Sequence, residues 1–246
     1  MDDELLTRRQ IKHNAKARLR ADGNWGQMMI ANLLPWLITV VFTFLSMWAM
    51  TTLINKFGVV RMATEPAAFA SYYEQHADTR SSLLKDLILL WFTQGIAFTA
   101  LDVYRGDLKR VRPGQAIMRL FNAQYFLGIL AVAIWVTFLT FIGVTAFIIP
   151  GILLMFGLTM SYYTYYDGKR TAENGRFGVF AALGQSWRLM RGFKLDYFVL
   201  QLSLIGWFIL EAITCHLFDF MIDPYLQMVD AGYYENIKAY HQRHVQ

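Results

Sequence analysis

The sequence predicts an all-α fold: a polytopic transmembrane helical bundle of six spans, built from pseudo-repeated helical hairpins with basic amphipathic interfacial helices. Hydrophobic residues make up 56% of the 246 residues and charged residues only 17%, whereas soluble domains are about 45–50% apolar and about 25% charged. Two charge-free stretches, Met28–Ile54 and Ala123–Tyr166, exceed the roughly 20 residues that a helix needs to cross a bilayer core. We therefore expect one integral membrane domain over residues 1–246.

The expected elements follow the alternation of apolar runs and short charged connections. One charge-free run is too long for a single span, because a helix over Ala123–Tyr166 would measure about 66 Å, twice a core of about 30 Å. We place its turn near Gly143–Pro150, with Pro150 and Gly151 as turn residues, since proline fits the first turn of a helix and breaks its interior. The prediction is an interfacial helix over 4–20 and spans over about 28–54, 83–103, 123–143, 147–166, 196–217 and 218–237.

The last segment is ambiguous by hydropathy, because Asp219, Asp223 and Asp230 are costly in lipid. An internal repeat favours counting it as a span. "QYFLGILAVAIW" aligns with "DYFVLQLSLIGW", "GQAIMRL" with "GQSWRLM", and "FIIP" with "FMIDP", at nearly constant spacing. The last match makes Pro224 a turn residue equivalent to Pro150. The N-terminal third fits the same unit more loosely, so two or three units stay open, and five spans is the alternative to six.

Charge placement supports six spans with both termini in the cytoplasm. Lys and Arg gather on the cytoplasmic side of membrane proteins. This topology puts all 23 Lys and Arg residues inside except Lys56, Arg61, Arg80 and Lys85.

Several classes of protein are disfavoured. The N-terminus lacks the apolar core and small-residue cleavage site of a signal peptide. One cysteine, Cys215, excludes an intramolecular disulfide. The net charge is +5, and the charged residues lie in short segments between apolar runs. Membrane proteins have this distribution, so we expect no nucleic-acid partner.

Some segments resemble a known family. "AKARLRADGNWG", "IIPGI", "SWRLMRGFK", "LSLIGW" and "DPYLQMVDAGYYENI" resemble, in order, the landmarks of integral membrane proteins, mostly from Gram-positive bacteria, catalogued as domain of unknown function 975. The resemblance covers nearly the whole chain and implies a six-helix protein of the bacterial cytoplasmic membrane. It departs at "CHLFDFMID", where the family tends to be apolar and glycine-rich. More distantly, the pattern resembles the membrane domain of some glycerophosphodiester phosphodiesterases, without room for their catalytic domain.

Candidate chemistry centres on Glu211, an intramembrane carboxylate and hence a candidate ligand or proton site, with Gln94 and Gln201 as possible partners. A structural hydrogen bond explains Glu211 equally well. His216 and Cys215 near it are competent zinc ligands. However, adjacent residues point about 100° apart on a helix, so we expect no metal site. HExxH, P-loop and GxSxG motifs do not occur, and we expect neither catalytic residues nor a cofactor.

Basic amphipathic segments at Arg8–Arg20, Arg105–Leu120 and Arg176–Lys194 should lie on the inner leaflet and attract anionic lipid headgroups, although they serve equally well as plain topology determinants. The candidate headgroup contacts are Arg8, Arg9, Lys12, Lys16, Arg188, Arg191 and Lys194. The sequence thus favours a non-enzymatic membrane protein that binds lipid or a protein partner, in envelope homeostasis or as a scaffold. The alternative is a small transporter or exporter accessory subunit for an amphiphilic or proton-coupled substrate, and an intramembrane enzyme ranks third.

Overall fold

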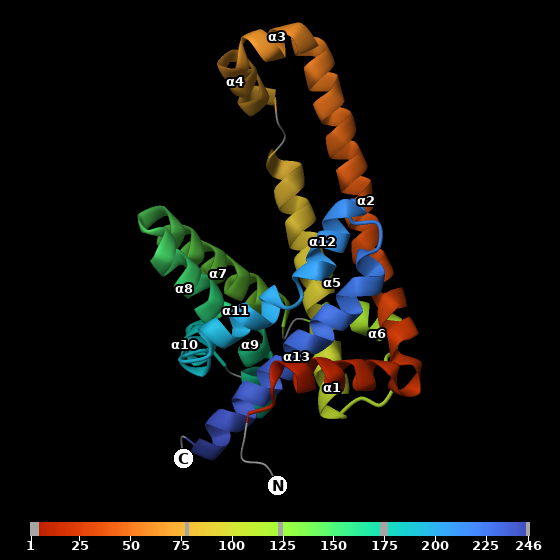
Figure 1. Cartoon of the computed structure of the whole chain (residues 1–246), viewed down its shortest axis with the longest axis vertical. Helices are drawn as coiled ribbons and strands as arrows, with labels where there is room; N and C mark the ends of the chain where they lie inside the picture. The colour runs from red at the N-terminus through yellow and green to blue at the C-terminus, as the bar shows by residue number, and fades with distance from the viewer. Residues whose placement is uncertain (1–4, 77–78, 123–124, 173–176, 245–246) are drawn as a thin grey trace.

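The computed structural model describes residues 5–76, 79–122, 125–172 and 177–244 (Figure 1). The starts of the predicted segments 4–20 and 123–143 lie outside the described residues. Within the described residues all regular structure is helical, which confirms the all-α prediction there. The elements are α1 (Arg8–Arg20), η1 (Ala21–Gly23), α2 (Asn24–Phe57), α3 (Val59–Thr64), α4 (Pro66–His76), α5 (Thr79–Arg105), α6 (Pro113–Met118), α7 (Phe126–Ala146), α8 (Ile148–Leu158), α9 (Ser161–Thr171), α10 (Val179–Leu189), α11 (Lys194–Leu202), α12 (Ile205–Ile213) and α13 (Asp219–His244).

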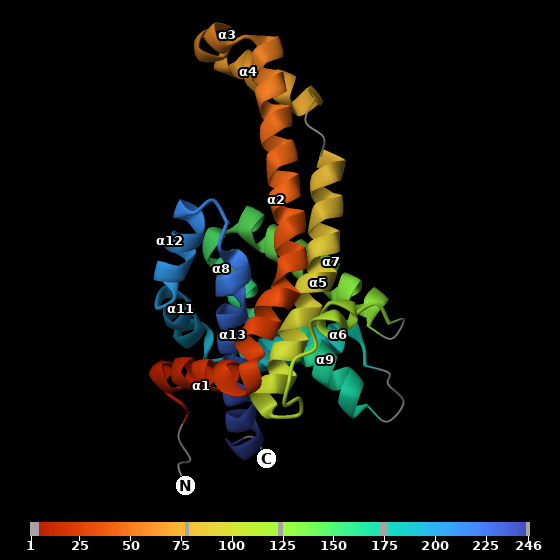
Figure 2. The ribbon, with the colours of Figure 1, turned by 90° about the vertical axis from the view of Figure 1, so that its right-hand side faces the viewer.

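Helix α1 is amphipathic, packs along α13 and lies beside the ends of α2 and α5 (Figure 2). It begins with a capping box, in which the Thr7 hydroxyl accepts from the Gln10 backbone and the Gln10 side chain accepts from the Thr7 backbone. Its apolar residues Ile11, Ala15 and Leu19 follow an i, i+4 spacing and are fully buried. This face therefore packs on the helical bundle, whereas a lipid-surface helix would turn it toward acyl chains.

Helices α2 and α5 run side by side and are joined through α3 and α4 at their far end (Figures 1 and 2). Helix α2 has 34 residues and is therefore about 51 Å long, more than a hydrocarbon core of about 30 Å. Its buried side chains lie in its first twelve residues, from Asn24 to Pro35. Beyond them, Phe44, Met47 and Trp48 are more than half exposed.

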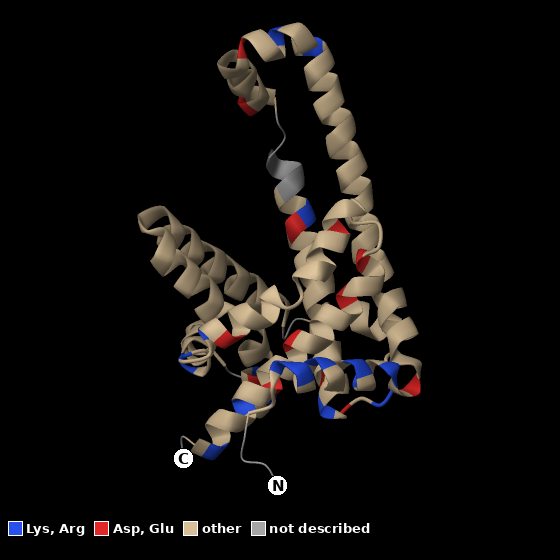
Figure 3. Ribbon diagram, in the orientation of Figure 1, with Lys and Arg blue, Asp and Glu red and all other residues tan. Residues whose placement is uncertain are grey.

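The buried core gathers at the end of the molecule that carries α1, the cation-rich end. Fully buried side chains there include Met28 of α2, Phe98 and Leu101 of α5, and Tyr233 of α13. Most Lys and Arg residues lie at the same end (Figure 3). The apolar side chains toward the other end are largely exposed, a distribution that suits contact with lipid.

Helices α7 and α8 form a hairpin that turns at Phe147, an extended residue. Pro150 lies in the first turn of α8, where its missing N–H is not needed. The two helices approach most closely at Gly143 and Gly151. A Cβ atom on Gly151 would lie 2.5 Å from the Val144 backbone nitrogen, so glycine is required by the close contact of the two backbones.

The predicted span 196–217 is broken. Helices α11 and α12 meet at 47° across Ser203 and Leu204. The Ser203 hydroxyl donates to the Leu200 carbonyl oxygen at 2.6 Å, a backbone interaction that bends helices. The chain then turns through Cys215 and His216, both at positive φ. This turn lies at the boundary between the predicted spans 196–217 and 218–237. The prediction of Pro224 as a turn residue is wrong, because Pro224 lies inside α13.

In the described part of the chain, four helical stretches are long and apolar enough to cross a membrane: Arg8–Phe57, which contains α2, then Leu83–Arg105, Phe126–Ala146 and Ile148–Thr171. The bent pair α11–α12 makes a fifth if it counts as one span. Among the described residues, α13 does not meet this criterion. Several long apolar helices are thus compatible with a membrane protein.

Candidate functional site

The C-terminal parts of α5, α9 and α13 each carry an acid and, three residues later, a base. This spacing places both side chains on one face of a helix. The pairs are Asp102 with Arg105, Asp167 with Arg170, and Glu235 with Lys238. We call these six residues the charge cluster. They come together at the cation-rich end, and their ion pairs join different helices.

Arg105 links all three helices. Its two terminal nitrogens donate to the two carboxylate oxygens of Asp167 at 2.7 and 2.6 Å, a bidentate geometry that is strong and directional. The same guanidinium donates to Glu235 at 2.5 Å. An arginine at the end of α5 therefore holds an acid of α9 and an acid of α13.

Asp167 is the most connected acid of the charge cluster. Besides Arg105, it accepts hydrogen bonds from Lys238 Nζ at 2.6 Å and from the Tyr234 hydroxyl at 2.7 Å. Its side chain is 9% exposed and that of Arg105 is 14% exposed. Removal of one partner would leave buried charge without compensation, which is costly.

Asp102 forms the second half of the charge cluster. One carboxylate oxygen accepts from Arg170 at 2.9 Å, and the other accepts from Arg119 and from the Tyr166 hydroxyl. Arg170 also contacts the exposed Asp107 at 3.3 Å. Asp102 thereby connects α5 with α9 and with the residue that follows α6.

The charge cluster contains three acids and three bases, and each of the six is paired within the protein. Aromatic rings lie beside it: Phe98 stacks on Tyr166 with ring centroids 4.5 Å apart, and Tyr163 stacks on Tyr234 at 5.2 Å. Such an arrangement can fix the relative position of three helix ends. Its charges already have partners, so it is suited to positioning helices more than to binding an anion.

Sequence reasoning missed the charge cluster, although its signal is present. An acid three residues before a base recurs in the C-terminal parts of α5, α9 and α13, and the acid directly follows a tyrosine in α9 and α13. Charge placement alone explains these cations as topology determinants.

The predicted partnership of Glu211 with Gln94 and Gln201 does not form among the described residues. Gln201 of α11 instead donates to Asp230 of α13 at 3.0 Å, and Tyr197 donates to the same oxygen at 3.1 Å. One carboxylate oxygen of Glu211 is buried without a hydrogen-bond partner in the described part of the chain. Of the two carboxylates Glu211 and Asp230, it is therefore Asp230 that has polar partners on a neighbouring helix.

A second polar contact holds α13 against α2. The side-chain amides of Asn32 and Gln227 exchange hydrogen bonds of 3.3 and 3.0 Å. Asn32 is fully buried. Of the three acids that made the 218–237 segment ambiguous by hydropathy, Asp230 is paired with a neighbouring helix through Tyr197 and Gln201.

The candidate headgroup residues lie on α1, α10 and α11 and, for Arg191, on the connection between α10 and α11. Arg8 donates to Asp196 at 2.7 Å, with both side chains more than 40% exposed, and Lys12 donates to Ser203 at 3.2 Å. Lys194 lies 3.2 Å from the centre of the Trp187 ring. Lys16 lies 5.6 Å from the Tyr225 ring centre, and Arg9, Arg188 and Arg191 are exposed.

Around the α12–α13 turn, the His216 ring nitrogen and Asp219 lie 2.8 Å apart. Trp36 anchors the turn through a 3.0 Å hydrogen bond from its indole nitrogen to the His216 carbonyl oxygen. Among the described residues, no three His, Cys, Asp or Glu side chains gather in an arrangement that could hold a metal ion.

The fold and the site together describe an all-helical protein compatible with a membrane, whose helix ends are joined by ion pairs. Residues 148–241 match the family described as Protein of unknown function (DUF975). This match confirms the family resemblance over residues 148–241, and the resemblance of the preceding residues stays a prediction. No curated protein and no solved structure matches the chain. The distant resemblance to the membrane domain of glycerophosphodiester phosphodiesterases stays a prediction.

Proposed function

We propose that this protein is a non-enzymatic, multi-pass protein of the bacterial cytoplasmic membrane that binds anionic lipid of the inner leaflet at its cation-rich end. One observation carries the proposal: most Lys and Arg residues lie at one end of the molecule (Figure 3), whereas strongly exposed apolar side chains such as Phe44 and Trp48 of α2 lie away from it. Anionic headgroups attract Lys and Arg at the membrane surface by about 1 kcal/mol for each cation.

Helix α1 contributes most to this surface. Its apolar face is buried in the bundle, so the helix keeps a fixed place, and its exposed cations point away from the core. The exposed cations of α1 are Arg8, Arg9, Lys16, Arg18 and Arg20. In this arrangement lipid binding acts through headgroups, because the apolar residues of α1 have no access to acyl chains.

The proposal includes six spans, with α11–α12 as a bent fifth and α13 as the sixth. The contacts of Gln227 with Asn32 and of Asp230 with Gln201 support this count, since polar groups within the membrane are tolerated when they pair inside the bundle. The charge cluster supports three hairpin units, because α5, α9 and α13 would be the three returning helices. Both termini would then be cytoplasmic.

The lipids that copurify with the protein test the proposal. We expect protein extracted in a mild detergent to retain anionic phospholipid in a larger proportion than the bulk membrane contains. A lipid fraction identical to the bulk membrane would contradict lipid binding. A stoichiometric metal ion would contradict the non-enzymatic assignment, and a stoichiometric protein would favour a scaffold role.

A small transporter is the second candidate, and Asp230 is the observation that favours it. This carboxylate lies midway along α13 and has a hydroxyl and an amide of α11 as partners, as a proton-binding group in a carrier would. Reconstituted protein would then show proton-coupled flux that is lost in Asp230→Asn. Flux that is retained in Asp230→Asn and lost in Glu211→Gln would return the role to Glu211.

A further inference from the structure

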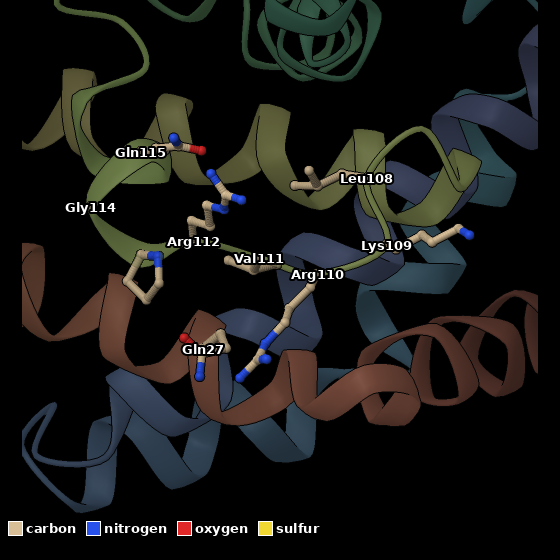
Figure 4. Close-up of a pocket in the computed structure, with 9 residues that line it drawn as sticks. Gln27, Leu108, Lys109, Arg110, Val111, Arg112, Gly114 and Gln115 are labelled. Carbon is tan, nitrogen blue, oxygen red and sulfur yellow. The ribbon is translucent and has the colours of Figure 1, made fainter.

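A basic pocket lies between the first turn of α2 and the segment that leads into α6 (Figure 4). It has a volume of about 770 Å³. Its walls are Gln27 on one side and residues 108–115 on the other. Three of the lining residues, Lys109, Arg110 and Arg112, are exposed cations.

The backbone of this pocket is held in place by one side chain of α2. The Asn24 amide nitrogen donates to the Lys109 carbonyl oxygen at 3.0 Å, and its oxygen accepts from the Val111 backbone nitrogen at 2.8 Å. Val111 itself is buried, with 1% of its surface exposed. These two hydrogen bonds fix the backbone on either side of Arg110. The cations of the segment therefore extend from a backbone of fixed position.

The chemistry of the pocket is that of an anion site. The described lining residues include three cations and the amides of Gln27 and Gln115, and no carboxylate is among them. Asp107, the nearest acid before the pocket in sequence, pairs with Arg170 instead. Guanidinium and ammonium groups are the usual partners of phosphate oxygens.

Both walls of the pocket change from polar to apolar within one helical turn. Ile30 lies three residues after Gln27 on α2 and is 50% exposed, and Met118 lies three residues after Gln115 on α6 and is 61% exposed. Residues three apart share a helix face. A ligand with a charged head and an apolar tail would match both features, whereas a soluble anion would use only the cations.

We propose that this pocket binds the phosphate group of an anionic phospholipid. Arg110, which points toward Gln27 (Figure 4), would contact the phosphate, Lys109 and Arg112 would add positive charge from the same segment, and Ile30 and Met118 would contact the start of the acyl chains. The proposal rests on the lipid-binding function above and assigns it one defined site. It adds a bound lipid to the general attraction between basic helices and an anionic leaflet.

Native mass spectrometry with added phosphatidylglycerol tests the site. The pocket variant replaces three cations together: Lys109→Gln, Arg110→Gln and Arg112→Gln. The matched control, Lys56→Gln, Arg61→Gln and Lys85→Gln, removes the same charge near the other end of α2 and α5, outside both the pocket and the cations of α1. Each cation near a phosphate contributes roughly fivefold in affinity. We therefore expect the pocket variant to bind phosphatidylglycerol roughly ten- to a hundredfold more weakly, and the control to bind within about threefold of the wild type.

Equal weakening in both variants would overturn the pocket, because diffuse charge would then explain the binding. If the wild type binds phosphatidylglycerol and the pocket variant binds it equally well, the pocket fails while the proposed function stands. If the wild type binds no more phosphatidylglycerol than phosphatidylcholine, the proposed function itself fails. Inorganic phosphate that displaces the lipid at equal concentration would overturn the assignment to a lipid and identify a soluble phosphate as the ligand. A thermal unfolding curve for each variant separates these outcomes from misfolding.

Discussion

Substitution of Asp167 by asparagine tests whether the charge cluster holds the helix ends together. Asp167 accepts two bonds from Arg105 and one each from Lys238 and Tyr234, all between 2.6 and 2.7 Å. Asparagine has one oxygen in place of two and directs an N–H₂ group at a cation. The variant therefore leaves part of the charge of Arg105 and Lys238 without compensation.

The magnitude follows from burial. Breaking a buried ion pair by removing one partner costs about 3–5 kcal/mol. Here Arg105 keeps its 2.5 Å bond to Glu235, and Lys238 is 28% exposed. We therefore expect Asp167→Asn to lose about 2–4 kcal/mol of unfolding free energy, at or just below that range.

The assay is unfolding in mixed micelles, followed by tryptophan fluorescence as denaturing detergent is added. Asp107→Asn is the matched control, because Asp107 makes only 3.3 Å contacts to Arg170 and is 48% exposed, and exposed pairs contribute about 0–1 kcal/mol. A double-mutant cycle with Arg105→Gln should give a coupling energy within roughly 0.5–3 kcal/mol. Equal stability of Asp167→Asn and Asp107→Asn would refute the reasoning.

Three further substitutions test other parts of the structure by the same unfolding assay. Gly151→Val places side-chain atoms against the Val144 backbone and should lower stability by about 1–3 kcal/mol. Gly184→Val is its control, because a Cβ there meets open space, and it should lower stability less. A larger loss in Gly184→Val than in Gly151→Val would contradict the hairpin contact. Asp230→Leu leaves the Tyr197 and Gln201 donors without their acceptor and should cost about 1–3 kcal/mol, so an unchanged unfolding curve would contradict that contact. Glu211→Leu removes a buried, unpaired carboxylate oxygen and should leave stability unchanged or raise it by about 1–2 kcal/mol; a clear loss would mean that Glu211 has a partner.

Much of the fold could be predicted because it depends on local properties of the chain. The absence of charge over Ala123–Tyr166 required a turn, and the chain turns at Phe147 within the 143–150 range. The i, i+4 spacing of Ile11, Ala15 and Leu19 predicted the amphipathic face of α1. Periodicity does not say what covers such a face, however. Packing of α1 on α13 was not predictable for that reason.

The pairing of polar residues could not be predicted, because it joins positions far apart in the sequence. Arg105 contacts acids 62 and 130 residues away, and Asn32 contacts Gln227 at a separation of 195. The sequence offers Gln94 and Gln201 as possible partners of Glu211 but does not say which helices face each other. In the fold, the break at Ser203 redirects α12, and Gln201 meets Asp230.

Site-directed labelling tests the central claim, that the cation-rich end of a six-span protein faces the cytoplasm. Single cysteines replace the exposed residues Ala17 of α1 and His244 of α13, each in a Cys215→Ser background. We predict that a membrane-impermeant maleimide labels neither site in intact cells and labels both after permeabilisation. Labelling of the His244→Cys variant alone in intact cells would contradict six spans. Labelling of both variants would place the cations on the outer surface and contradict the proposed function.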